Sequence, residues 1–400
     1  MSHQSRVGLR RPADLAPRDE PGHEPQLIAE IRAEITSSGP ITFARFMELA
    51  LYHPALGYYA TGRRGPGRSA DFLTAPESHP IFGWSIAAQV DEAWNRLGRP
   101  ARFTVRELGA GTGALAAGIL DGLARSGSPL RQSIRYRVAE RSADRGRQVR
   151  ERLAMVGAGD VLEPDPGEPI TGVVVANEVL DALPVHRVIG GEGGRLLESL
   201  VGLDSVGALA AVTGPPSTPA LEARLASEGI TLAPDQAAEV CLEIDPWIRH
   251  AAAGLERGLL LLIDYGHPAA ALYDFGRGSL LRAYVGQRVH DDPFRNVGHQ
   301  DLTAHVDLSA VERAAQEAGL QHLGTTTQAE FLAGLGAAEL LVALQTDGRA
   351  DLGAYLEARS ALVRLLDPTA TGRFAVLVFG RGVDPAPPLR GLSFRMPGEA

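Results

Sequence analysis

Closely spaced glycines follow a stretch of the sequence that has the composition of a strand. The stretch is Phe103–Gly113 (FTVRELGAGTG), and the amphipathic segment Ala114–Ser126 comes directly after it. A strand, a glycine loop and a helix form the front half of a βαβ unit. Glycine lets the backbone turn tightly and lets a ligand come close, and the helix N-terminus offers free N–H groups to an electron-rich ligand. The predicted ligand-binding residues of this loop are Gly109, Ala110, Gly111 and Gly113.

The spacing of these glycines and two nearby acids narrow the choice of ligand. The loop reads GxGxG rather than the GxGxxG of dinucleotide-binding proteins, which disfavours an NAD-dependent dehydrogenase. Glu107 precedes the glycines, and Glu140 ends the next predicted strand, Ser133–Glu140, where a carboxylate can bind both hydroxyls of an adenosine ribose. This arrangement resembles the class I methyltransferases that use S-adenosylmethionine (SAM). The alternative is a glycine turn in an ordinary α/β domain.

Polar residues also follow the apolar run Gly172–Ala176, whose composition is typical of a strand buried on both faces. Asn177, Glu178 and Asp181 come after this strand. In open α/β sheets, ligands bind at the carboxyl ends of the strands, so these side chains are expected at a binding site. Asn177 could contact the cofactor or form an Asx-turn, and the two acids could bind substrate or simply order the loop.

A long connection separates this strand from the next buried one, Gly258–Gly266. Residues 177–258 number 82, whereas a whole βαβ crossover needs only about 30 residues. The connection therefore contains an insertion, at about 185–257. Val185–Ile189 and Arg195–Leu203 predict a hairpin within it. We expect the insertion to form a wall of the substrate site or a contact in a homodimer.

The remaining segments are assigned from their composition and periodicity. Residues 1–24 contain prolines and mixed charges and predict a disordered tail. Residues 25–100 contain amphipathic helical patterns that precede the first strand, so they are expected to form a helical cap over the site. Residues 101–384 form the predicted α/β core, and residues 385–400 a loose C-terminal tail.

The bulk composition argues against several classes of protein. The net charge of −9 and the pI of about 5.7 disfavour a nucleic-acid binder and suit a basic partner. Cys241 is the only cysteine, so no internal disulfide can form, and its apolar neighbours predict an inert buried thiol. No apolar run has the length of a transmembrane helix, and no signal peptide is recognisable, so no membrane insertion is expected. Acidic residues near the N-terminus disagree with a mitochondrial presequence, which leaves a cytoplasmic location as the expectation.

Several segments, in matching order, resemble the MidA family of SAM-dependent methyltransferases, which includes the mitochondrial complex I assembly arginine methyltransferase. The likeness covers residues 39–382 and is carried by Asp71–Glu77, Glu107–Gly113, Ala176–Pro184 (ANEVLDALP), Ile263–His267 (IDYGH) and Asp301–Asp307 (DLTAHVD). The resemblance implies a class I methyltransferase fold with a doubly wound, seven-stranded sheet, and SAM as cofactor. It adds Thr74 and Glu77 to the cofactor-binding residues. It also implies methylation of arginine on a protein partner, with a respiratory complex I subunit as the type of target.

An arginine acceptor sets definite chemical requirements. It is a cation with a pKa above ~12, and carboxylates can bind its guanidinium through two hydrogen bonds at once. Glu178 and Asp181 are therefore the predicted catalytic residues, with His267 as a candidate proton acceptor. His267 could equally be an ordinary hydrogen-bonded loop residue. No compact ligand motif such as HExxH occurs, so no metal is expected.

Three functions stay open at this point. The chain could be a protein arginine methyltransferase, a small-molecule N- or O-methyltransferase, or an assembly factor that binds SAM with little catalysis. A nucleic-acid amino-methyltransferase is disfavoured, because such enzymes show an Asn/Asp-Pro-Pro-aromatic run after the fourth strand. Here that position reads Asn177-Glu178-Val179-Leu180.

Overall fold

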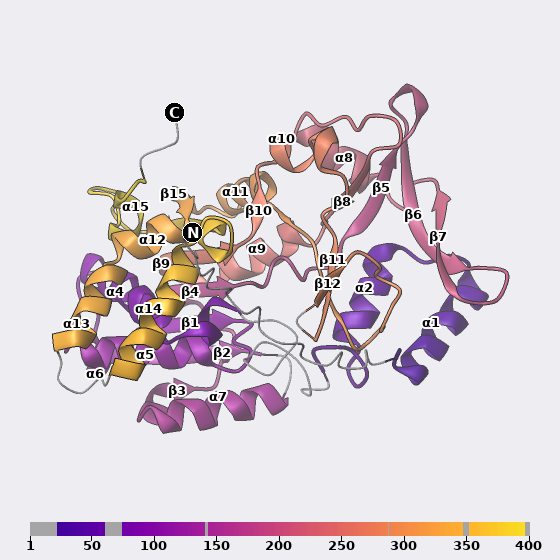
Figure 1. Ribbon diagram of the computed structural model, residues 1–400. Helices are drawn as coiled ribbons and strands as arrows, with labels where there is room; N and C mark the ends of the chain where they lie inside the picture. The colour runs from indigo at the N-terminus through magenta and orange to yellow at the C-terminus, as the bar shows by residue number, and fades with distance from the viewer. Residues whose placement is uncertain (1–21, 61–73, 141–142, 287, 347–351, 397–400) are drawn as a thin grey trace, which may run out of the picture.

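The continuous apolar runs of the sequence form the centre of a seven-stranded sheet (Figure 1). The computed structural model describes residues 22–60, 74–140, 143–286, 288–346 and 352–396. The strand order is β15 (Gln321–Thr327), β16 (Ala375–Arg381), β9 (Leu255–Asp264), β4 (Ile170–Asn177), β1 (Phe103–Leu108), β2 (Ile134–Ala139) and β3 (Leu162–Glu163). The five strands from β9 to β3 run parallel, whereas β16 pairs antiparallel with β9, and β15 pairs antiparallel with β16. The predicted doubly wound, seven-stranded sheet is therefore confirmed.

Helices cover both faces of this sheet because alternate residues of its strands point to opposite sides. Val173 and Val175 of β4 face a core formed with α4 (Ile81–Arg96), α5 (Ala114–Arg125), α7 (Ala143–Met155), α12 (Gln328–Gly334), α13 (Ala337–Thr346) and α14 (Leu352–Leu366). Val174 and Ala176 face a second core formed with α9 (Ile244–Ala253) and α11 (Leu308–Glu317). A strand buried on both faces explains why the sequence of β4 is apolar without alternation.

The insertion after β4 forms a sheet of its own. Its four strands are antiparallel, in the order β7 (Leu209–Gly214), β6 (Leu196–Leu203), β5 (His186–Gly190) and β8 (Ala237–Val240), and α8 (Ala220–Ser227) connects β7 to β8. The predicted hairpin is confirmed as β5 and β6. The expected extent of 185–257 includes α9, which packs instead on the main sheet through buried residues such as Ile248.

The two N-terminal helices lie against this inserted sheet, as Figure 1 shows. They are α1 (Pro25–Ser38) and α2 (Phe43–Tyr52), and Thr42 caps α2 by accepting a hydrogen bond from the Arg45 N–H. Their apolar residues share a core with the insertion and with residues 281–304. Ile41 also forms an isolated bridge to Val201 of β6. The two helices are therefore joined to the insertion rather than to the main sheet.

The third long helix of the predicted cap region, α4, occupies a different place. It packs against α5 so closely that a Cβ on Gly83 would lie 2.6 Å from the Cα of Gly118. Its apolar face, which includes Phe82 and Ile86, belongs to the core of the main sheet. The range 25–100 thus contains a cap of two helices and a third helix that covers the sheet.

Short elements complete the chain. The helices are α3 (Ala75–Ser78), α6 (Leu130–Ser133), α10 (Ala269–Leu272) and α15 (Arg390–Ser393), with 3₁₀ turns at Gly159–Val161, Glu192–Gly194, Phe275–Arg277 and Thr371–Arg373. The strands are β10 (Gly266–His267), β11 (Arg282–Val285), β12 (Arg288–His290), β13 (Asp301–Thr303) and β14 (Val306–Asp307). Within the described residues no single helix is long and apolar enough to cross a membrane. The pair α12 and α13, bent by 53°, passes that test by length and composition only when taken together.

The described parts of the two predicted tails are attached to the fold. The prediction of a loose tail over 385–400 is wrong for residues 389–392, because Leu389 and Leu392 are buried in the core of the main sheet. A Cβ on Gly391 would even overlap the ring of Phe331. At the other end, residues 1–21 of the predicted disordered tail lie outside the described residues. Glu24 donates its N–H to the Val297 carbonyl.

Candidate active site

A cavity of about 1270 Å³ opens at the carboxyl ends of β1 and β4. Its lining comes from the glycine loop after β1, the turn after β4, the ends of β2 and α3, and parts of the cap and the insertion. The carboxyl ends of parallel strands meet at one edge of a sheet, which is where ligands bind in open α/β folds. The cavity therefore lies where the sequence predicts the site.

The glycine loop adopts a backbone that ordinary residues avoid. Gly109, Gly111 and Gly113 all have positive φ, at 72°, 54° and 80°. Gly109 and Gly111 line the cavity together with Ala110, whereas Gly113 begins α5. A Cβ on Gly113 would lie 3.1 Å from the Cα of Val149 in α7, so its small size serves helix packing. The loop thus offers two glycines, rather than three, to a ligand.

Two acids flank this loop, in different environments. The Gly111 N–H donates a hydrogen bond of 3.2 Å to Oε2 of Glu140, which places that carboxyl against the loop and in the cavity lining. Glu107 is 4 % exposed and accepts a hydrogen bond of 2.6 Å from the Tyr136 hydroxyl. Desolvation raises the pKa of Glu107 to about 8, although the Tyr136 hydrogen bond acts in the opposite direction. Glu107 therefore takes up a proton readily near neutral pH.

Thr74 and Glu77 lie at the start and within the first turn of α3, and both line the cavity. Glu77 forms an ion pair of 2.8 Å with Arg152 of α7 and a hydrogen bond with the Thr112 hydroxyl. It therefore ties α3 to the glycine loop and to α7. Residues 71–73 of the family segment that contains Thr74 and Glu77 lie outside the described residues.

Glu178 has the most unusual backbone of the site. Its φ of 53° is left-handed, a conformation that costs free energy for a residue with a Cβ. Its carboxylate accepts hydrogen bonds from the Ala75 N–H at 3.2 Å and from the Asn177 side chain at 2.9 Å. Desolvation and the charge of Asp181 raise the pKa of Glu178 to about 7. Oδ1 of Asn177 is buried and has no partner among the described residues, so it can accept a hydrogen bond from a ligand.

Asp264, at the end of β9, orders the turn that follows Glu178. Its Oδ2 atom accepts hydrogen bonds from three successive backbone N–H groups, those of Val179, Leu180 and Asp181, at 3.1, 2.8 and 3.3 Å. The loop-ordering role that the sequence leaves open for Asp181 therefore belongs to Asp264. Asp181 itself is buried, and desolvation raises its pKa to about 6.

Two further polar residues join this cluster of acids without a prediction from the sequence. Tyr59, from the loop after α2, lines the cavity and donates a hydrogen bond of 2.8 Å to Asp301 of β13. Desolvation, followed by the charge of Asp181, raises the pKa of Asp301 to about 8. The guanidinium carbon of Arg145 lies 5.5 Å from the centre of the Tyr59 ring. The only signal in the sequence is that Asp301 begins the DLTAHVD segment.

The family of this chain follows from its similarity to known proteins. Residues 85–326, more than half of the chain, match the profile of a family described as "Putative S-adenosyl-L-methionine-dependent methyltransferase". The chain belongs to this family, the MidA family of SAM-dependent methyltransferases.

Named relatives from animals belong to the same family. The protein arginine methyltransferase NDUFAF7 homolog of Drosophila melanogaster is 29% identical to this chain, covering 92% of the chain and 88% of the relative. The protein arginine methyltransferase NDUFAF7 of Rattus norvegicus is 30% identical, covering 79% and 76%. Both are described as mitochondrial.

A solved structure of the family shows the cofactor. It is the crystal structure of a superfamily member and likely methyl transferase from Burkholderia thailandensis, bound to S-adenosyl-homocysteine. Its sequence is 34% identical to this chain, and the two structures superpose with a TM-score of 0.82. The match covers 92% of this chain and 95% of that one. A second structure from the same organism, without a named ligand, matches at 35% identity and a TM-score of 0.81, covering 92% and 94%. The cofactor of this MidA-family chain is therefore SAM.

The side chains of the cavity fit that cofactor. Gly109 and Gly111 line the cavity in a left-handed backbone that favours glycine, Glu140 follows β2, and Asn177 offers a buried acceptor atom. These residues would hold the adenosine and amino-acid parts. When bound, SAM supplies a methyl group on a positively charged sulfonium, which carboxylates nearby would favour.

Of the three predicted catalytic residues, only Glu178 lines the cavity: Asp181 is buried and outside the lining, and His267 lies elsewhere. As part of β10 it pairs with β14, its ring stacks on His305 with centroids 5.3 Å apart, and its Nε2 lies 2.8 Å from Arg277. Burial lowers the pKa of His267, which keeps it neutral. Among the described residues, no group of three or more His, Cys, Asp or Glu side chains is placed to hold a metal ion.

Proposed function

We propose that this MidA-family methyltransferase transfers the methyl group of SAM to an arginine side chain of a protein partner. One observation carries the proposal: carboxyl groups gather at the cavity beside the glycine loop, with Glu178 held there in a left-handed conformation. Strained backbone that the surrounding structure maintains is typical of functional positions. The names of the animal relatives, which are protein arginine methyltransferases, support the same acceptor.

The charge of the cluster suits a guanidinium. Desolvation raises the pKa of Glu178, Asp181 and Asp301, and repulsion from the charge of Asp181 raises the pKa of Glu178 and Asp301 further. A cation that enters the site would relieve this repulsion and favour the ionised carboxylates. Two carboxylates can also hold the fork of a guanidinium in one orientation, which aligns a nitrogen with the methyl group. Lysine presents a single point charge and would be held less well.

The proton balance of the reaction is also consistent with this site. Transfer breaks the sulfur–methyl bond, forms a nitrogen–methyl bond and releases one proton from the guanidinium nitrogen. Glu178 lines the cavity, and its pKa of about 7 lets its carboxylate take up that proton near neutral pH. The charge of Asp181 increases the proton affinity of Glu178 further. Positioning and electrostatics, rather than a strong base, would supply most of the acceleration.

Labelling of an extract tests the proposal. The purified protein is incubated with methyl-labelled SAM and a cell extract of its source, and label is followed in protein bands and in small molecules. Label in a protein band supports a protein acceptor, label only in small molecules supports an N- or O-methyltransferase, and no label supports a SAM-binding assembly factor. The Gly111→Val protein serves as the control, because Gly111 lines the cavity with a φ of 54° and a valine there is expected to exclude the cofactor.

A further inference from the structure

The cavity is larger than SAM alone requires. Pockets for a single small ligand have volumes of about 300–1,000 Å³, whereas this cavity measures about 1270 Å³. Its inner half consists of the glycine loop and the ends of β2 and β4. Its outer half is lined by residues of α2, by residues 182–184 of the turn after β4, by His186 of β5, and by residues within 242–250 before and in α9. The outer half is therefore a second compartment, continuous with the cofactor site.

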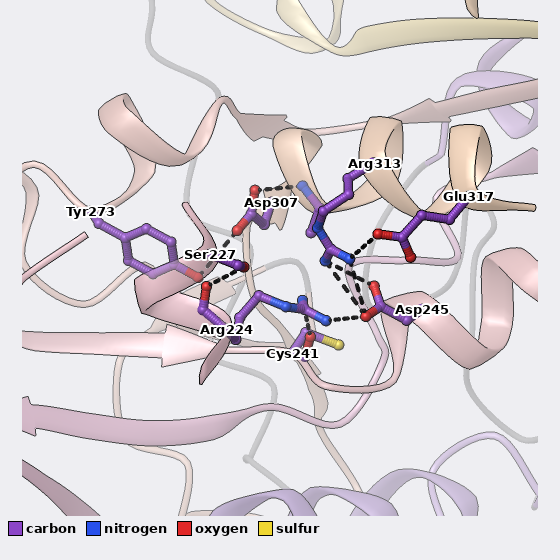
Figure 2. A network of polar contacts seen from close by, with 9 residues as sticks. Arg224, Ser227, Cys241, Asp245, Tyr273, Asp307, Arg313 and Glu317 are labelled. Atoms are coloured by element: carbon purple, nitrogen blue, oxygen red, sulfur yellow. Dashed lines mark hydrogen bonds and ion pairs between the residues drawn. The ribbon is translucent and has the colours of Figure 1, made fainter. Parts of the chain in front are cut away.

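Both walls of this outer compartment are fixed in place. On one side, the hydroxyl of Tyr52 in α2 donates a hydrogen bond of 2.9 Å to the Ala182 carbonyl. On the other side, Asp245 accepts hydrogen bonds from Arg224 at 2.7 Å and from Arg313 at 3.1 Å, as Figure 2 shows. Arg224, which is buried, also donates a hydrogen bond to the carbonyl of Cys241, the residue that precedes the lining residues 242–250. The compartment is thus preformed rather than assembled by a ligand.

The side chains that face this compartment favour a cation. Glu48 and Glu243 contribute two carboxylates, and Trp247 contributes a partly exposed aromatic ring. The guanidinium of Arg45 also faces it, but forms ion pairs with both Glu48 and Glu34 at 2.8 and 3.0 Å. Of the two histidines in the lining, His186 lies 2.7 Å from the buried carboxylate of Glu198, and His250 is exposed. The two carboxylates of Glu48 and Glu243 thus outnumber the one arginine, Arg45, among these residues.

We propose that the outer compartment binds the peptide segment that flanks the target arginine, and that this segment is basic. Lysine or arginine side chains of the segment interact with Glu48 and Glu243, and one of them lies against the Trp247 ring. The inference rests on the proposed function for the arginine at the inner end, but the binding of the flanking residues can be measured separately. The net charge of −9 gives the whole protein the same preference.

Two labelled peptides test this inference by fluorescence anisotropy in the presence of S-adenosylhomocysteine. Each has a central citrulline, a neutral analogue of arginine, flanked on both sides by lysines in one peptide and by glutamates in the other. The basic peptide is expected to bind and the acidic peptide to bind much more weakly. The double change Glu48→Gln and Glu243→Gln is expected to lower the affinity for the basic peptide about five- to thirty-fold. This is the size expected for the loss of two exposed charges. Calorimetry is expected to show unchanged SAM affinity.

A matched control removes two carboxylates from elsewhere. Glu222 on α8 and Glu357 on α14 are exposed and lie outside the cavity lining, so Glu222→Gln with Glu357→Gln changes the net charge equally. Equal weakening in the control pair, or no binding of the basic peptide to the wild type up to about 1 mM, overturns the inference. If the basic peptide binds as expected but its arginine counterpart receives no methyl group, the peptide compartment stands and the proposed arginine chemistry is contradicted.

Discussion

The carboxylate of Glu178, at the end of β4, accepts a hydrogen bond of 3.2 Å from the N–H of Ala75, which lies 103 residues earlier in the chain. This contact joins the segment before the sheet to the turn that carries the predicted catalytic acids. Because Glu178 is also held by a hydrogen bond from its own N–H to Ile263, its position is determined by three separate parts of the sequence. The acid is therefore part of a preorganised site rather than of a mobile loop.

Removal of the charge at Glu178 should impair transfer without affecting the cofactor. Glu178→Gln keeps the shape and much of the hydrogen bonding, so the fold and the SAM affinity are expected to stay near wild type. Methyl transfer is expected to fall by about 10²-fold or more, the scale for the loss of a positioned electrostatic group. Initial rates with labelled SAM, together with calorimetry of SAM binding, measure both quantities. Full activity in this variant would return Glu178 to a structural role.

The two acids after β4 should act as one unit. Asp181→Asn is expected to reduce transfer in the same direction as Glu178→Gln, and the double variant should lose less than the product of the two single effects. The reason is that one carboxylate alone binds a guanidinium poorly once the charge of the other carboxylate has been removed. The comparison is made on one substrate at one pH. Strictly multiplicative losses would show that the two residues do not share a group.

Glu178 should also affect how stability depends on pH. Its pKa is about 7 in the folded chain against an ordinary value of 4.5, so the folded state binds the proton more tightly. This group therefore favours folding below its ordinary pKa, and the contribution is lost as the pH rises through about 7. The loss is at most about 3 kcal/mol. Glu178→Gln should flatten the rise of urea sensitivity between about pH 5 and pH 8, and an unchanged pH profile would contradict the shift.

The glycine loop and the acid of β2 should govern the affinity for SAM. Gly111→Val is expected to abolish binding, because valine strongly disfavours a φ of 54° and its side chain would fill the space for the cofactor. Glu140→Ala is expected to weaken binding by about 1–3 kcal/mol, the scale for losing charge-assisted hydrogen bonds. Calorimetry on variants shown to be folded by circular dichroism measures both. An unchanged affinity for SAM in either variant would show that the changed residue does not contact the cofactor.

Asp264 should matter for stability rather than for substrate binding. Asp264→Ala would leave three backbone N–H groups in the turn after β4 without their acceptor, so a loss of at least about 2 kcal/mol of unfolding free energy is expected. Asp181→Asn, a change at a neighbouring buried acid that leaves the turn intact, is the control and should cost less. Denaturant unfolding of the two variants gives the comparison. A larger loss of unfolding free energy in Asp181→Asn than in Asp264→Ala would show that Asp181, and not Asp264, orders the turn.

The sequence predicts the parts of the site that depend on local order. A strand followed by polar residues predicts Glu178, which lines the cavity, and the glycine spacing predicts the loop, because both signals lie within a few neighbouring residues. The contact between Tyr59 and Asp301 joins residues 242 positions apart and leaves no local pattern. Gly113 shows the opposite limitation: the motif includes it, but only the packing of α5 against α7 reveals why a side chain does not fit there.

The position of α4 is a similar case. Its helical pattern is clear in the sequence, but nothing local states which surface its apolar face covers. The close approach of Gly83 to Gly118 places it on the main sheet rather than over the site. Leu389 and Leu392 are likewise buried by tertiary packing within the segment 385–400, which the sequence predicts to be a loose tail.

The chemical identity of the methylated product tests the central claim most directly. Protein labelled in an extract by the wild-type enzyme is hydrolysed to amino acids, and the labelled species is identified by mass spectrometry, with the double variant Glu178→Gln, Asp181→Asn as the control. Methylated arginine is expected, together with a strong loss of that label in the double variant. Label on lysine, on carboxyl groups or only on small molecules, or undiminished methylarginine in the double variant, would contradict it.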